Sequence, residues 1–208
     1  MAGGCGRTYR VDPSLDPAPC NALQDTGTGL LVPATVLQGQ PGITVTAPAA
    51  GDCPQAWQIG VDASWAQNST LTFAHALNGA DRVYEQITEI PPLTIPRAGT
   101  WEVDYNTRGV AQIPAGTAAS LYVVAGIYKN GALIVGSEAM LAGTTGAGSV
   151  IQIQATGGMS FLHPFAAGDV VTLWAYRVGQ TGTASIASNP DGRTRISCHW
   201  LAPVGDGP

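Results

Sequence analysis

The chain has 208 residues, enough for one full-sized β domain with an extension or for two small domains. Apolar residues make up 45% and charged residues only 11%, which excludes the usual signature of a disordered chain, namely low hydrophobicity with high net charge. The net charge is −5 and Lys129 is the only lysine, so the chain lacks the clustered basic residues that nucleic-acid binding requires.

The termini and cysteines give few signals of targeting or metal binding. No apolar run is long enough for a transmembrane helix, so membrane insertion is not expected. Residues 1–7 lack the apolar core of a secretory signal. Cys5, Cys20, Cys53 and Cys198 do not have the spacing of zinc ligands. The sequence leaves open whether Cys5 and Cys20 form a disulfide, whereas Cys198 lies in an alternating segment and is expected to be a buried free thiol.

Residues 1–55 predict an extended and mostly irregular N-terminal arm. Prolines interrupt this segment repeatedly, among them Pro13, Pro17, Pro19, Pro33, Pro41 and Pro48. Only residues 29–32 and 43–46 have the composition of short strands. Because such a segment cannot bury much surface by itself, we expect it to anchor on its own domain or on a neighbouring protein.

Strand patterning begins at Trp57. Apolar residues alternate with polar or small ones over residues 57–65, which predicts a half-buried strand whose inward positions are Trp57, Ile59, Val61, Ala63 and Trp65. Another short strand is expected within residues 70–77. Residues 81–87 are compatible with a helix, which Pro91 and Pro92 would end early.

The central strands are the most clearly patterned. Over residues 101–110, Trp101, Val103, Tyr105 and Thr107 are expected on one face. Residues 121–128 are apolar on both faces, as in a strand that is covered on both sides. Asn130-Gly131 follows directly and predicts a tight hairpin turn into residues 133–135, because a type I′ turn needs positive φ at both central residues.

Three more strands complete the pattern. They are expected at residues 149–156, 170–176 and 194–201, with a turn at residues 189–192 before the last one. About eight strands separated by Gly, Pro, Asn and Asp turns, with no convincing helix, predict an all-β sandwich or jelly roll over residues 56–204. Residues 205–208 form a short tail.

Four aromatic residues stand out on the second face of the two most apolar strands. Tyr122 and Tyr128 alternate with aliphatic residues in one strand, and Trp174 and Tyr176 do so in another. Since aromatic residues are enriched at protein interfaces, these four are candidate subunit-interface residues. The alternative, in which the N-terminal arm covers the same face, is equally compatible with the sequence.

The sequence does not point to an enzyme. Ser160 lies near His163, but its surroundings do not match the nucleophile elbow of hydrolases. Glu102 and Asp104 share one face of a strand, where exposure to solvent explains them more simply than a paired-carboxylate mechanism. We therefore expect no catalytic residue, no cofactor and no metal site.

Four segments resemble the C1q/TNF-like jelly-roll family. Residues 92–103 are similar to the family's P-x-x-G-x-Y-x-F entry, and Tyr128-Lys129-Asn130-Gly131 looks like its K-N-G turn. Residues 162–174, which include Ala167-Gly168-Asp169-Val170, resemble its L-x-x-G-D-x-V-x-L segment. Residues 194–201 occupy the place of its final strand but lack the expected Phe and Gly. The resemblance covers about residues 57–203 and implies a ten-strand jelly roll that assembles as a homotrimer.

The N-terminal arm has a resemblance of its own. Residues 5–6, 20–23 and 29–34 resemble the openings of virion structural proteins of bacteriophages that infect high-GC actinobacteria. This implies a non-enzymatic virion protein, made in the host cytoplasm, that attaches by its arm to other capsid or tail proteins. It would serve as a capsid decoration, a head fibre or a minor tail protein. The alternative is a receptor- or carbohydrate-binding module that contacts a host cell-surface glycan, for which Trp65, Trp101 and Trp200 are candidates.

Overall fold

The computed structural model describes residues 24–25, 30–31, 37–39, 43–47, 57–61, 64–146 and 149–203. The N-terminal part contains two short antiparallel pairs: β1 (Gln24–Asp25) with β2 (Leu30–Leu31), and β3 (Ile43–Thr46) with β4 (Gln58–Val61). In the second pair the Thr44 hydroxyl donates a hydrogen bond of 3.2 Å to the Gly60 carbonyl. Cys5, Cys20 and Cys53, and most of the predicted arm, lie outside the described residues.

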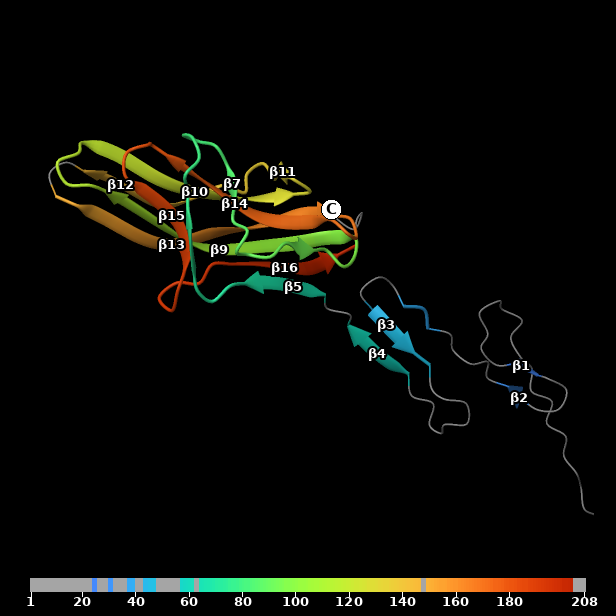
Figure 1. The fold of residues 1–208 in the computed structure, drawn as a ribbon. Coiled ribbons are helices and arrows are strands. Elements are labelled where there is room, and N and C mark those ends of the chain that lie inside the picture. The colour runs from blue at the N-terminus through green and yellow to red at the C-terminus, as the bar shows by residue number, and fades with distance from the viewer. Residues whose placement is uncertain are drawn as a thin grey trace, which may run out of the picture. The chain divides into compact units, whose positions relative to one another are not determined.

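The remaining strands form two antiparallel sheets that pack face to face (Figure 1). The first sheet contains β5 (Trp65–Ser69), β6 (Phe73–Ala76), β9 (Gly99–Ile113), β13 (Ile151–Phe165), β15 (Thr183–Ser188) and β16 (Arg195–Ala202). The second contains β7 (Glu85–Gln86), β8 (Leu93–Thr94), β10 (Ala119–Lys129), β11 (Ala132–Leu133), β12 (Ala139–Gly146) and β14 (Val170–Val178).

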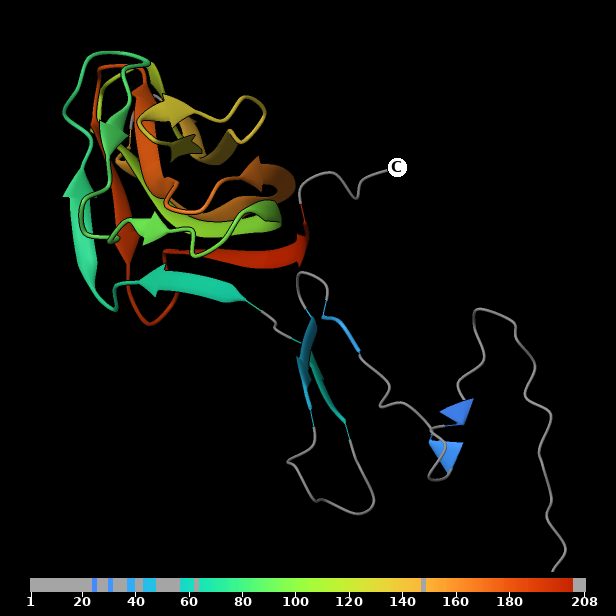
Figure 2. The same cartoon turned by 90° about the vertical axis from the view of Figure 1, so that its right-hand side faces the viewer.

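The order of the strands defines the fold. The chain passes from β9 in the first sheet to β10 and β12 in the second, returns to β13, crosses to β14, and returns to β15 and β16 (Figure 2). Within the sheets, β9 lies between β13 and the pair β15/β16, while β10 lies between β12 and β14. Double-sheet sandwiches with these Greek-key crossings are jelly rolls. The fold is an all-β jelly-roll sandwich.

On one side of β9, each of the next two positions in the first sheet is filled by two short strands in succession. β15 and β16 both run antiparallel to β9 along one edge, and the turn at residues 189–192 separates them. Their outer neighbours, β6 and β5, are separated by residues 70–72. The Ser188 hydroxyl donates a 2.7 Å hydrogen bond to the Thr70 carbonyl, so the two interruptions are joined to each other.

The alternation predicted for the central strands is confirmed. Every second residue of β9, from Trp101 through Tyr105 to Ile113, is fully or almost fully buried. The same holds for alternate residues of β10 and β14, which face β9 across the sandwich: Leu121, Val123, Ala125, Ile127, Val171, Leu173 and Ala175. Cys198 is buried and not disulfide-bonded, as expected, and burial raises the pKa of its thiol to about 12. These side chains form one continuous core.

Several strand predictions are wrong in detail. The alternating segment 57–65 is not one strand, because β4 ends at Val61 and β5 begins at Trp65. Ile59 and Trp65, both predicted to face inward, are 66% and 63% exposed. Residues 81–87 contain a turn and the short strand β7 in place of the possible helix. Strands β12 and β15 were not foreseen.

Candidate interaction surfaces

Three of the four predicted interface aromatics come together on the outer face of the second sheet. Tyr128 and Trp174 stack with their ring centroids 4.5 Å apart. Tyr84 comes from the segment before β7 and makes edge-to-face contacts with two of these rings. Its ring centroid lies 5.2 Å from that of Tyr128 and 4.6 Å from that of Tyr176. We call Tyr84, Tyr128, Trp174 and Tyr176 the aromatic cluster. Aromatic pairs favour these stacked and edge-to-face arrangements over direct face-to-face contact.

A carboxylate and a glycine hold Tyr84 in place. The Tyr84 hydroxyl donates a 2.5 Å hydrogen bond to Glu138, and the Tyr176 hydroxyl donates a longer one of 3.4 Å to the same oxygen. Burial and the hydrogen bond to Glu138 raise the pKa of Tyr84 far above its ordinary value. A Cβ at Gly126 would lie 3.1 Å from the Tyr84 hydroxyl, so the bare backbone of β10 makes room for this ring.

Tyr122 does not join the aromatic cluster. It pairs with Gly143 on β12, and its ring occupies the space that a side chain at position 143 would need. The outer face of the second sheet is therefore partly covered by the chain itself. The covering residue is Tyr84, which the sequence analysis did not single out. The assignment of Tyr122, Tyr128, Trp174 and Tyr176 to a subunit interface stays a prediction.

Tyr84 is expected to contribute strongly to stability. Replacing Tyr84 with alanine removes two ring contacts and the hydrogen bond to Glu138, and we expect the free energy of unfolding to fall by about 2 kcal/mol. Urea unfolding followed by tryptophan fluorescence measures this change. The matched control is Val83→Ala, since Val83 is 51% exposed and its truncation should change stability by less than about 0.5 kcal/mol. Equal effects of the two substitutions would contradict the role given to Tyr84.

The single lysine belongs to a second cluster, at the hairpin between β10 and β11. Lys129 donates 3.0 Å hydrogen bonds to the Asp169 carboxylate and to the Pro164 carbonyl. Asp169 also accepts hydrogen bonds from the Asn130 side chain at 2.7 Å and from the Ala166 amide at 2.8 Å. Asn130 in turn accepts from the Val170 amide at 2.8 Å. The K-N-G and G-D segments noted in the sequence thus bind each other and close this end of the sandwich.

A pocket of about 420 Å³ opens beside this cluster. It is lined by Lys129, Ala132, Leu133, Ile134, Val135 and His163. The His163 ring lies edge-to-face with Phe165, and burial together with the Lys129 charge lowers the pKa of His163. The lining is mostly apolar, and the ammonium group of Lys129 is already paired with Asp169.

The hydrogen bonds to the Asp169 carboxylate should make the stability of the fold depend on pH. Burial alone would raise the pKa of Asp169, but the hydrogen bonds from Asn130, Ala166 and Lys129 outweigh it and lower the pKa. A carboxyl group whose pKa is lowered by folding stabilises the fold above its unfolded pKa of about 3.9, and this contribution is lost as the pH falls through the folded value.

Asp169→Asn should therefore be less stable than the parent chain at neutral pH, and the difference should shrink as the pH falls below about 4. Urea midpoints measured at a series of pH values test this expectation. A difference that stays constant with pH would show that the charge of Asp169 plays no part.

The candidate catalytic residues are not assembled into a catalytic arrangement. Ser160 and His163 are three positions apart on β13 and face opposite sides of the sheet. The Ser160 hydroxyl donates to Glu102 at 2.9 Å, not to a histidine. Within the described residues, no group of three or more His, Cys, Asp or Glu side chains could hold a metal ion. In the same part of the chain, no helix has the length and apolarity needed to cross a membrane.

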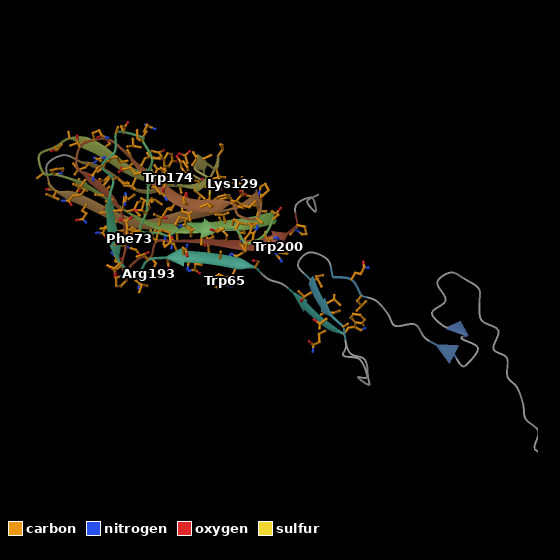
Figure 3. The ribbon with its side chains drawn as sticks, turned by 45° about the vertical axis from the view of Figure 1, so that its right-hand side comes forward. Trp65, Phe73, Lys129, Trp174, Arg193 and Trp200 are labelled. Atoms are coloured by element: carbon orange, nitrogen blue, oxygen red, sulfur yellow. The ribbon has the colours of Figure 1, made fainter. Side chains whose placement is uncertain are left out.

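The three candidate tryptophans have different environments. Trp101 is fully buried. Trp200 is partly buried, and the Arg97 guanidinium lies 3.7 Å above its ring. Only Trp65 is largely exposed; Figure 3 shows it on β5, in the layer opposite the one that carries Trp174. The sequence named all three as candidates, but its alternation pattern predicted an inward-facing Trp65, and the structure contradicts that orientation.

Comparisons with known proteins add little to this description. No protein-family model matches the sequence, and no curated protein matches it. A solved structure of Eiger TNF from S. frugiperda is similar over 69% of this chain and 97% of that chain, with 8% sequence identity and a TM-score of 0.36. The jelly-roll assignment made above follows from the strand order of this chain alone.

Proposed function

We propose that this chain is a non-enzymatic structural protein that acts by assembling with copies of itself and with other proteins of a bacteriophage particle. The observation that carries this proposal is strand β13. It is 15 residues long and lies at the edge of the first sheet, and among the described strands it pairs only with β9. It contains no Asp, Glu, Lys or Arg. Monomeric proteins usually protect such an edge with charged residues, bulges or very short strands.

A homotrimer is the assembly that we propose for the sandwich. The family resemblance of the sequence supports it, as does the position of a long uncharged edge strand at the side of the jelly roll. Closed rings of identical subunits use two different surfaces of each copy. An edge strand with no charge to exclude a neighbour suits one of these two surfaces.

The role in a virion rests on the N-terminal arm and on composition. Residues 1–55 are rich in proline, and the arm resembles the openings of actinobacteriophage structural proteins. We propose that the arm binds a capsid or tail protein and that the jelly roll projects from it, as a capsid decoration, head fibre or minor tail component. The protein would be made in the host cytoplasm and released with the particle.

A second candidate function is supported by one residue. Trp65 is 63% exposed, and exposed tryptophans next to polar side chains are common in sites for sugars. The chain would then be a receptor- or carbohydrate-binding module that contacts a host-surface glycan. A glycan array probed with the parent chain and with Trp65→Ala distinguishes this function, because only the parent chain should bind.

Removal of the arm tests the proposed role in the particle. A chain that begins at residue 56 should fold, because the sandwich strands lie beyond that point, but it should not be incorporated into particles. Particles assembled in the presence of tagged full-length or truncated protein can be purified and compared by immunoblotting. Equal incorporation of the truncated protein would overturn the anchoring role of the arm.

A further inference from the structure

Three arginines from two segments of the chain meet on the outer face of the first sheet. Arg195 of β16 pairs with Asn106 of β9, and Arg108 lies two residues further along β9 on the same face. The same antiparallel register, continued by two residues, brings Arg193 close to Arg108. In agreement, a Cβ at Gly192 would lie 2.7 Å from the Nη1 atom of Arg108. We call Arg108, Arg193 and Arg195 the arginine cluster.

No carboxylate of the described residues forms an ion pair with the arginine cluster. Arg193 donates a hydrogen bond to the Leu71 carbonyl, and Arg108 donates one of 2.7 Å to the Gln154 side chain. The Nε atom of Arg108 is buried and has no hydrogen-bond partner in this part of the chain. Among the same residues, the Arg195 side chain forms neither a hydrogen bond nor an ion pair. Three like charges held close together repel one another, and an anion bound between them would offset that repulsion.

This concentration of positive charge contrasts with the rest of the chain. The chain has only nine basic residues and a net charge of −5, yet three of the nine meet here. Elsewhere the basic groups have structural partners: Lys129 is paired with Asp169, and Arg177 with backbone carbonyls. Two carboxylates lie in the vicinity of the cluster, Asp104 on β9 and the exposed Asp191 in the turn before β16. Because neither is paired with an arginine, the cluster is available to a ligand.

An exposed aromatic ring lies on the same face, at the other end of β5. Trp65 is 63% exposed and begins β5, whereas Ser69 ends this strand and pairs with Arg195. Four residues of strand separate the two positions, a distance of about 13 Å. The outward residues between them, Gln67 and Ser197, are polar, and Ser197 is only 5% exposed. A short oligosaccharide can therefore span the distance from Trp65 to the arginine cluster along a low, polar surface.

We propose that this face binds an acidic oligosaccharide: one sugar ring stacks on Trp65, and a carboxylate, sulfate or phosphate group of the same glycan binds the arginine cluster. Guanidinium groups bind such anions through paired hydrogen bonds, which makes arginine better suited to them than lysine. The Asp104 carboxylate, between the two ends, can accept hydrogen bonds from sugar hydroxyl groups. This inference rests on the second candidate function, glycan binding, and names the class of glycan and the residues that select it.

The composition of this face favours an acidic oligosaccharide over other anions. A free phosphate ion would use the arginines only and would leave Trp65 without a role. Nucleic-acid binding relies on many phosphate contacts along a basic surface, whereas here Glu102 and Asp104 of β9 would repel a polyanion. An oligosaccharide with neutral sugars near these carboxylates and one acidic group at the arginines matches both ends of the face.

A glycan array probed with the full-length chain tests the proposal. The array carries uronic-acid-containing, sulfated and phosphorylated oligosaccharides, each beside its uncharged counterpart. The unsubstituted chain should prefer the acidic members, and added salt should weaken this binding. Titration of the best-bound acidic member should show an affinity at least about tenfold lower for Arg195→Gln and for Trp65→Ala.

Two controls accompany this experiment. Arg82→Gln removes a positive charge elsewhere, from a side chain that is 67% exposed, and should bind like the unsubstituted chain. The Arg195 guanidinium has no partner among the described residues, so Arg195→Gln should keep the circular dichroism spectrum and urea midpoint of the unsubstituted chain. Inorganic phosphate, titrated separately, should bind more weakly than the acidic oligosaccharide.

The outcomes separate the inference from the function on which it rests. If Arg195→Gln binds the acidic members as tightly as the unsubstituted chain while Trp65→Ala does not, the arginine cluster is not part of the site, although glycan binding stands. A preference for the uncharged members leads to the same conclusion. If no member of the array binds, both the inference and the glycan-binding function fail. If inorganic phosphate binds as tightly as the acidic members and Trp65→Ala has no effect, the cluster is a site for small anions and the proposal is overturned.

Discussion

Arg177→Met should lower the free energy of unfolding by about 3 kcal/mol or more, because it leaves several buried carbonyl groups without a donor. Arg177 is only 7% exposed although it is charged. Its guanidinium donates to three backbone carbonyls: Gly179 at 2.8 Å, Gly182 at 3.0 Å and Leu77 at 3.4 Å. No ion pair joins it to a carboxylate in the described part of the chain, so backbone dipoles alone compensate its charge.

The geometry of the guanidinium explains why other residues cannot replace Arg177. Its planar fork reaches two carbonyls of the loop at residues 179–182 and the carbonyl of Leu77, directly after β6, at the same time. Arg177→Lys should therefore recover only part of the lost stability, since an ammonium group cannot span the same acceptors. Urea unfolding at neutral pH measures both variants. The exposed Arg82→Met serves as control, with an expected change below about 0.5 kcal/mol. If Arg177→Met also changes the free energy of unfolding by less than about 0.5 kcal/mol, the hydrogen bonds from Arg177 to the three carbonyls do not stabilise the fold.

Ser137→Ala should cost about 2 kcal/mol of unfolding free energy, because it removes the hydrogen-bond partner of a buried amide. Ser137 is fully buried, and its hydroxyl accepts from the Ile127 amide at 3.0 Å and donates to the Ile127 carbonyl at 3.2 Å. The backbone carbonyl of Ser137 accepts a 2.7 Å hydrogen bond from the hydroxyl of Tyr105, which lies in the core. This residue therefore links the turn before β12 to both sheets.

The matched control for Ser137 is Ser120→Ala. Ser120 is exposed, and its hydroxyl pairs with that of Thr145, so both groups can bind water when the pair is lost. Its truncation should change the free energy of unfolding by less than about 0.5 kcal/mol. Equilibrium unfolding in urea compares the two variants. The dependence of the free energy of unfolding on urea concentration should be the same in both, which shows that only stability has changed. Similar small effects at both positions would mean that water or a backbone shift satisfies the Ile127 amide.

The sequence predicted the centre of the fold well, for a simple physical reason. Strands β9, β10 and β14 are long, and each buries every second residue, so hydrophobic alternation alone identifies their inward faces. The Asn130-Gly131 turn was equally clear, and both residues have positive φ, at 50° and 81°. Features that depend on a period of two or on a single turn are readable without tertiary information.

Other parts of the fold could not be read in this way. The alternation through residues 57–65 is continuous in sequence, so it does not show that one strand ends at Val61 and another begins at Trp65. Strand β12 has the sequence AMLAGTTG, which is too rich in small residues to alternate. Arg177 follows Ala175 at an inward position of β14, but its acceptors belong to loops that only the folded chain brings near.

The candidate surfaces could likewise be predicted only in part. Alternation placed Tyr128, Trp174 and Tyr176 together on one outer face, and the structure brings them together. What covers them could not be predicted, because Tyr84 comes from a segment that is distant in sequence and lacks a regular pattern.

The molar mass of the full-length chain in solution tests the central claim most directly. Size-exclusion chromatography with multi-angle light scattering, at micromolar concentration and moderate salt, should give three times the mass of one chain. Dilution over a concentration series should lower that mass, because self-association depends on the concentration of the chain. A mass equal to that of a single chain throughout the concentration series would contradict self-association and, with it, the proposal that this jelly roll acts by assembly.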